Sequence, residues 1–230
     1  MRLDKFLAEN TGLTRSQATK ALRQSAVTIN GKIEKSGATK VTAQDEICFE
    51  GEVLPWVEAG QYIMFYKPQG YVCSNDDGDY PTIYQFFDYP LNNKLHSAGR
   101  LDVDTTGLVL LTDDGQWSHR ITSPKHQCEK TYLVTLADPV EDHYQQACAE
   151  GILLRGEKML TKPAKLEILD DYNVNLTISE GRYHQVKRMF AALGNKVVGL
   201  HRWKIGHIEL DEQLQEGEFR SLTEDEINYF

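Results

Sequence analysis

The densest group of side chains with catalytic potential lies in the segment GRLDVDTTGLVLLTDDG, residues 99–115, which holds four aspartates. Their spacing matches part of a calcium-binding EF-hand loop, where oxygen ligands recur at alternate positions before an invariant glycine. Such a loop also needs an oxygen ligand or a water at its ninth position, and this chain has Leu110 there, inside an apolar run. An apolar run of this kind is typical of a buried strand, so we do not interpret the segment as a calcium site.

Paired carboxylates are a second possibility for the same segment. Asp102 and Asp104 alternate along the chain and could face the same way, as the two carboxylates of a glycosidase do. Spacing alone does not decide this. For Asp104, Asp113 and Asp114 we favour the simpler role of turn residues, because Asp and Gly are favoured in turns. The seven histidines show no metal-ligand spacing such as H-E-x-x-H, so we predict no metal site.

A second segment, SEGRYHQVKRMFAALG (residues 179–194), predicts an amphipathic helix that begins near His184 and is closed by Gly194. His184, Lys187 and Arg188 lie on the face opposite its apolar stripe. A glycine and Arg182 precede the helix, so the amides of its first turn are available to an anion. This arrangement suits a phosphate or a catalytic carboxylate, although a merely solvated face would also explain Lys187 and Arg188.

The elements that must position these residues form an α+β body with a mixed, largely antiparallel sheet. Alternating or apolar segments predict strands at 62–66, 107–112, 131–136, 165–169, 174–179 and 196–200. Helical patterns cover 141–150 and 184–193, and a capping box at Thr223 and Glu226 predicts a helix near the C-terminus.

The first part of the chain predicts a separate small α/β module. An apolar face over residues 3–7 indicates a helix that ends near Gly12, and Thr14 with Gln17 forms a capping box for a second helix. Asn30-Gly31 is a strong signal for a tight hairpin. The segment GEVLPWVEAGQ reads as a connection, so we predict domains at 1–59 and 60–230.

Charge is distributed unevenly between these parts. The whole chain carries −9, yet residues 1–44 hold eight basic and three acidic side chains, a net of +5, which leaves −14 for the rest. A basic module attached to an acidic body indicates that one end binds a polyanion. A merely solvated basic face is the alternative, and charge alone does not decide between them.

The remaining composition is that of a cytoplasmic protein that does not contact membranes. Apolar runs such as GLVLL are too short to cross a bilayer, and no signal-peptide pattern opens the chain. The four cysteines are scattered without a C-x-x-C pair, which favours free thiols in a reducing compartment.

Taken together, these motifs resemble the pseudouridine synthases that modify ribosomal RNA. GRLDVDTTGLVLLTDDG is similar to the family's catalytic motif, with Asp102 in the place of its invariant aspartate. YKPQGYVCS, EKTYLV and EGRYHQVKRMF resemble three further family motifs in the same order, with Lys187 where many relatives use arginine. RLDKFLAENTGLTRSQATKALRQSAVTINGKI resembles an S4-type RNA-binding domain. The likeness spans essentially the whole chain, with no departure at a matched catalytic position.

The resemblance implies a pseudouridine synthase fold and the isomerisation of a specific uridine in 16S ribosomal RNA, without a cofactor, by an enzyme that we expect to be a monomer. It implies Asp102 as the catalytic carboxylate, Lys187 as the cation that keeps it ionised, and Tyr132 as the ring that stacks under the uracil. Arg100 is expected to bind a flanking phosphate or fill the space that the flipped nucleotide leaves. Further RNA contacts are expected from Lys67, Arg182, His184, Gln185, Arg188, Arg2, Lys5, Arg15, Lys20, Arg23 and Lys32.

Two other functions stay open on the residues alone. The first is a non-catalytic RNA-binding or ribosome-assembly protein, in which the basic module would bind RNA and the second domain would be a scaffold. A nucleoside or glycoside hydrolase would use Asp102 and Asp104 as its carboxylate pair.

Overall fold

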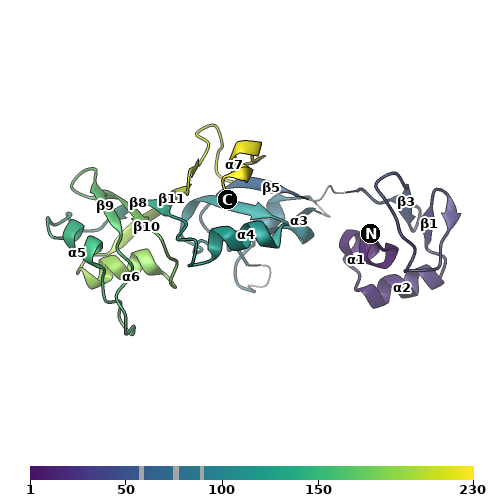
Figure 1. Cartoon of the computed structure of the whole chain (residues 1–230), viewed down its shortest axis with the longest axis horizontal. Coiled ribbons are helices and arrows are strands. Elements are labelled where there is room, and N and C mark those ends of the chain that lie inside the picture. The colour runs from purple at the N-terminus through teal and green to yellow at the C-terminus, as the bar shows by residue number, and fades with distance from the viewer. Residues whose placement is uncertain (57–59, 75–77, 89–90) are drawn as a thin grey trace. The chain divides into compact units, whose positions relative to one another are not determined.

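The computed structural model describes residues 1–56, 60–74, 78–88 and 91–230 (Figure 1). The chain divides into two compact units. The first comprises Met1–Ala59 and Tyr84–Leu95, and the second comprises Gly60–Ile83 and His96–Phe230.

Two helices of the first unit begin and end where the sequence signals predict. Helix α1 (Leu3–Thr11) ends at Gly12, which has the left-handed backbone conformation that suits glycine. Helix α2 (Arg15–Arg23) starts at a complete capping box, in which Thr14 and Gln17 each satisfy a backbone amide of the other. Both predictions are confirmed.

A small antiparallel sheet completes the first unit, with the strand order β2-β1-β3-β4. Asn30 and Gly31 both have positive φ and join the first two strands, as the hairpin signal predicted. Residues from both helices and the sheet form one apolar core, which the ring of Trp56 extends by packing against Phe6. The strands are β1 (Val27–Ile29), β2 (Lys32–Ile33), β3 (Ile47–Phe49) and β4 (Glu52–Val53).

The second unit is built on one large sheet with the order β13-β5-β7-β11-β8-β10-β9, in which β12 also pairs with β11 and β6 with β7. Among the named strands of the described residues, every pairing in this sheet is antiparallel except that between β7 and β11. The strands are β5 (Tyr62–Lys67), β6 (His96–Ser97), β7 (Thr106–Thr112), β8 (Lys130–Leu136), β9 (Lys165–Ile168), β10 (Asn173–Ile178), β11 (Val197–Ile205), β12 (Ile208–Glu209) and β13 (Phe219–Ser221).

Helix α4 (Gly115–Thr122) is an element that the sequence analysis missed. We interpreted Asp113-Asp114-Gly115 as a turn, but the Asp114 carboxylate accepts hydrogen bonds from the amides of Gln116 and Trp117 and so caps a helix. The other helical segments are η1 (Ile83–Phe86), α3 (Leu91–Lys94), α5 (Tyr144–Glu150), α6 (Gln185–Ala192) and α7 (Glu224–Asn228).

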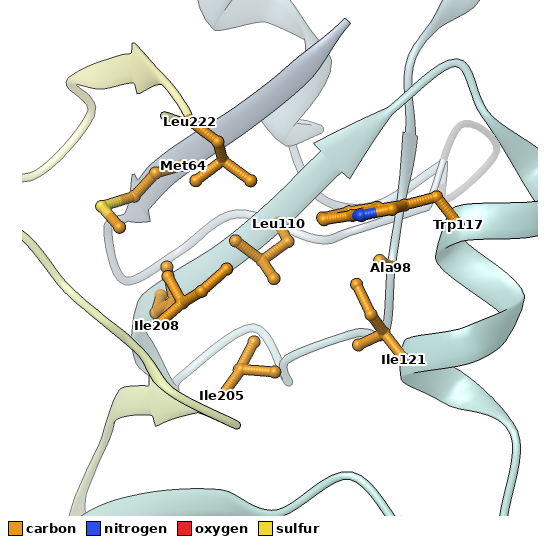
Figure 2. Close-up of a cluster of buried hydrophobic side chains, with 9 residues drawn as sticks. Met64, Ala98, Leu110, Trp117, Ile121, Ile205, Ile208 and Leu222 are labelled. Atoms are coloured by element: carbon orange, nitrogen blue, oxygen red, sulfur yellow. The ribbon is translucent and has the colours of Figure 1, made fainter. Parts of the chain in front are cut away.

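An apolar core holds α4 against β5 and β7 (Figure 2). Met64, Leu110 and Trp117 contribute from these three elements, and the chain beyond β11 closes the cluster with Ile208 and Leu222. Because the sheet is anchored in this way, the loop that enters β7 starts from a fixed position.

The parallel contact between β7 and β11 is unusually close. Gly107 has a φ of 110°, and a Cβ atom there would lie 2.2 Å from the carbonyl oxygen of Arg202. Only glycine fits, on both conformational and steric grounds. The segment that carries Asp102 therefore enters the sheet directly beside β11.

No helix in the described part of the chain is long and apolar enough to cross a bilayer. All four cysteines are free thiols.

Candidate active site

Asp102 lies in a tight turn just before β7, and a buried lysine fixes that turn. The amide of Thr105 donates to the carbonyl of Asp102 at 3.1 Å. Lys67, at the end of β5, donates to the carbonyls of Pro68 at 2.9 Å and Thr105 at 2.7 Å. Lys67 is 0% exposed, and its contact with RNA stays a prediction. Burial also lowers the pKa of its ammonium group.

Lys187 approaches the same turn from helix α6. Its Nζ lies 3.0 Å from Oδ2 of Asp102 and 2.5 Å from Oδ1 of Asp104. Burial by itself lowers the pKa of Lys187, but the hydrogen bonds to Asp104 and Asp102 outweigh it and leave the pKa above its ordinary value. Lys187 is therefore a cation at neutral pH, held between two carboxylates.

His184 contacts Asp102 from the other side. Its Nε2 lies 3.4 Å from Oδ1 of Asp102. The helix begins one residue later than predicted, and His184 is its N-cap with φ 46° and ψ 38°, a left-handed conformation that is uncommon outside glycine. The two segments that the sequence singled out thus meet at Asp102.

These side chains line a cavity of about 440 Å³. Tyr132, on β8, also lines it and is nearly buried. Arg100, two residues before Asp102, lines it with an exposed side chain. Asp102, Lys187, His184, Tyr132 and Arg100 are therefore brought together, as the sequence analysis predicted for one site.

Two cations at this cavity were missed by the sequence analysis. Arg202 is 2% exposed, its guanidinium carbon lies 5.9 Å from the Tyr132 ring centre, and its Nε donates to the carbonyl of Leu108. Its Nη2 has no hydrogen-bond partner among the described residues. Lys130 donates to the carbonyl of Cys128 at 2.6 Å, and burial lowers its pKa. Lys130 stands in the motif EKTYLV, to which the sequence analysis gave a role only through Tyr132, and Arg202 lies in no motif that the sequence analysis singled out.

Arg182 and Arg188 hold a neighbouring loop. Arg182 donates to the carbonyls of Met159 and Leu160, and Arg188 donates to the carbonyl of Arg155 and to the Glu157 carboxylate. Their direct contact with RNA stays a prediction, since much of their donor capacity is used within the protein.

Gln185 makes its hydrogen bonds within the protein. Its side chain is nearly buried, accepts from the amide of Arg182 at 2.8 Å and donates to Glu180 at 3.0 Å. The residue shapes the entry to helix α6 and also lines the cavity, and its direct contact with RNA stays a prediction.

The other three aspartates of residues 99–115 were predicted to be turn residues, and each makes further contacts in the structure. Asp113 accepts from the amides of Gly60 and Gln61, while Asp114 caps α4. Asp104 is more than a turn residue, because it shares Lys187 with Asp102. In the described residues, no group of three or more His, Cys, Asp or Glu side chains is placed to hold a metal ion.

The predicted RNA-binding residues of the first unit are all exposed, which allows the expected contacts without testing them. Arg2 and Arg15 both bind the Asp4 carboxylate, at 2.7 and 3.1 Å, and Lys5 pairs with Glu9 at 3.5 Å. The exposed set is Arg2, Lys5, Arg15, Lys20, Arg23 and Lys32.

Comparison with known proteins identifies the class of this fold and site. Residues 61–192 match the family of RNA pseudouridylate synthases, and residues 1–47 match the S4 domain. The chain belongs to the RNA pseudouridylate synthase family.

Individual relatives agree over the full length. The chain is 84% identical over 230 residues to the ribosomal small subunit pseudouridine synthase A of Pasteurella multocida, covering 100% of this chain and 99% of that protein. It is 82% identical over 227 residues to the protein of the same name from Haemophilus influenzae, covering 99% and 98%. A crystal structure of a pseudouridylate synthase with 80% identity superposes with a TM-score of 0.73, covering 99% of this chain and 98% of that one.

Proposed function

We propose that this chain converts one uridine of 16S ribosomal RNA in the small subunit to pseudouridine, with Asp102 as the catalytic carboxylate. The observation that carries the proposal is the contact of Lys187 Nζ with Asp102 Oδ2, at 3.0 Å on the wall of a cavity that Tyr132 also lines. The names of the two relatives with more than 80% identity support the small-subunit substrate.

The reaction breaks the N1–C1′ bond, turns the uracil, and joins C5 to C1′. The C5 proton leaves and N1 gains a proton, so the RNA keeps its mass. In this reaction an ionised carboxylate can act as a nucleophile toward the sugar or the base. Alternatively, it can deprotonate the sugar. Lys187 places its positive charge 3.0 Å from Oδ2 of Asp102, next to the carboxylate that would act.

Tyr132 and Arg100 fit the handling of a flipped nucleotide. A base removed from its stack is held between aromatic or apolar surfaces, and the ring of Tyr132 offers such a surface inside the cavity. The exposed Arg100 at the same cavity suits a flanking phosphate.

The domain 1–59 supplies affinity, and the domain 60–230 supplies the chemistry. Exposed basic side chains of the first domain bind RNA phosphates, which releases counterions and makes binding fall with salt. The enzyme acts as a cytoplasmic monomer on this RNA.

The direct test is Asp102→Asn, which keeps the size of the side chain and removes its charge. We expect the rate of pseudouridine formation in transcribed small-subunit RNA to fall by about 10³-fold or more, with RNA binding within about twofold of wild type. Activity equal to wild type would refute the catalytic assignment. Release of free uracil by the wild type would instead favour a hydrolase.

A further inference from the structure

Tyr183 presents an aromatic ring to solvent beside the catalytic turn. Its side chain is 75% exposed, although one face of the ring is stacked on His184 with centroids 3.8 Å apart and planes 22° apart. The opposite face of the phenol ring is therefore open. Because Tyr183 also lines the cavity, this open aromatic face offers a contact surface to a ligand there.

The stacked pair connects to the catalytic carboxylate. His184 Nε2 lies 3.4 Å from Asp102 Oδ1. Tyr183 and His184 line the 440 Å³ cavity and also a neighbouring cavity of about 550 Å³, and Asp102 and Lys187 line both. The pair thus lies on the wall that the two neighbouring cavities share.

The backbone holds this pair in place at a conformational cost. His184 has φ 46°, and such a conformation persists in a non-glycine residue only when its surroundings enforce it. Arg188 Nη1 donates to the carbonyl of Tyr183 at 3.1 Å, and the amide of Arg182 donates to Gln185 Oε1 at 2.8 Å. Residues on both sides of the dipeptide are therefore fixed.

We propose that the Tyr183–His184 pair is a stacking platform for the base of a nucleotide that flanks the isomerised uridine. The inference rests on the proposed function and adds a second nucleotide subsite to it. Flipping a uridine out of its strand deprives the adjacent base of a stacking partner. An aromatic ring can replace that partner for any base, because every base has a π face.

The test compares Tyr183→Leu, which removes the aromatic face, with Tyr183→Phe, which keeps it. Tyr172→Leu is the matched control, since Tyr172 is also exposed but lines neither cavity. The probe is a short single-stranded RNA of alternating uridine and 2-aminopurine, which places the fluorescent base next to a uridine in every register. All variants are also prepared with Asp102→Asn, so that the RNA stays unmodified.

We expect 2-aminopurine fluorescence at saturation to be quenched by wild type, Tyr183→Phe and Tyr172→Leu, and much less by Tyr183→Leu. The dissociation constant of Tyr183→Leu should rise by about tenfold, as for the loss of one base–aromatic stack. Equal quenching by Tyr183→Leu and wild type would overturn the proposal, as would a contact of Tyr183 with a protein partner rather than RNA. Because quenching is read without catalysis, an active Asp102→Asn enzyme would refute the proposed function and leave this result standing.

Discussion

Two ion clusters, one in each unit, have opposite composition. In the first unit one carboxylate, Asp4, binds two guanidinium groups, those of Arg2 and Arg15. In the second unit one ammonium group, that of Lys187, binds two carboxylates. The first cluster keeps a surplus positive charge and the second a surplus negative charge. The surplus charge, rather than the ion pair itself, therefore sets what each cluster is suited to: the first suits a phosphate, and the second leaves one carboxylate charge that the single ammonium group does not balance.

The two clusters also differ in the solvent exposure of their cations. The cations of the first cluster, Arg2 and Arg15, are 53% and 60% exposed, whereas the cation of the second, Lys187, is 26% exposed. Among the carboxylates, Asp4 is 10%, Asp102 29% and Asp104 54% exposed, so the contrast lies in the cations. Water and salt screen exposed charges much more than partly buried ones. Changes in the Lys187 cluster should therefore have large effects on catalysis, and changes in the Asp4 cluster small effects on binding and stability.

The largest effect among the cluster cations is expected from Lys187→Met, which keeps the length of the side chain and removes its charge. Asp102 and Asp104 would then face each other without a cation between them. We expect kcat to fall by about 10²–10³-fold, as for the loss of one preorganised electrostatic contact. Single-turnover measurement of pseudouridine formation tests this, with RNA binding measured in parallel.

Lys187→Arg is the matched control for that experiment, because it restores the charge with a different geometry. It should recover part of the lost rate. If Lys187→Met keeps the wild-type rate, the cation has no role in activating Asp102.

A smaller effect is expected from Asp104→Asn. Asp104 is one of two groups that raise the pKa of Lys187, so its neutralisation should lower that pKa. If protonated Lys187 takes part in catalysis as proposed, the alkaline limb of the pH–rate profile should move to lower pH. Near neutral pH we expect a loss of about tenfold, because Lys187 also loses a positioning contact. A profile that superposes on the wild type would show that Asp104 is only a turn residue.

The two units also differ in how much of their local structure could be predicted from the sequence. Local signals were sufficient where a backbone conformation depends on a few neighbours, as in the capping box at Thr14 or the hairpin at Asn30-Gly31. They failed at Asp114, because the same residue types form a turn or cap a helix, and the packing of Trp117 decides between them.

The residues of the candidate active site could likewise be predicted only in part, because local signals do not bring distant segments together. Asp102 and Lys187 are 85 positions apart, and the family resemblance, rather than any spacing, joined them. In the sequence, Lys67 was expected to contact RNA, and Arg202 was given no role. The structure shows that both side chains are buried near the close approach of β7 and β11 at Gly107. Lys67 holds the turn that carries Asp102, and Arg202 lies against the ring of Tyr132.

The first unit offers a weaker perturbation in Arg15→Gln. If Arg15 contacts a phosphate, its removal should weaken RNA binding by a few fold and reduce the slope of log K against log salt by about 0.7–0.9. Filter binding between low and moderate salt measures both values. The rate on bound RNA should not change, because Arg15 belongs to the other cluster. An unchanged slope would mean that Arg15 serves Asp4 alone.

The smallest expected effect is the pH dependence of folding that Asp4 contributes. A hydrogen bond from Arg2 is the main cause that lowers the pKa of Asp4 from 3.8 to about 2 in the folded chain. A carboxyl group with a depressed folded-state pKa stabilises the fold above its unfolded pKa, and this stabilisation is lost as the pH falls toward the folded value. The thermal stability difference between wild type and Asp4→Asn should therefore be constant near neutral pH and shrink between about pH 4 and pH 2. We expect the total change to be about 1 kcal/mol or less, because its partners are exposed and screened. A difference that stays constant down to pH 2 would show that the two arginines do not stabilise the Asp4 carboxylate in solution, and that the first cluster is held by its backbone instead.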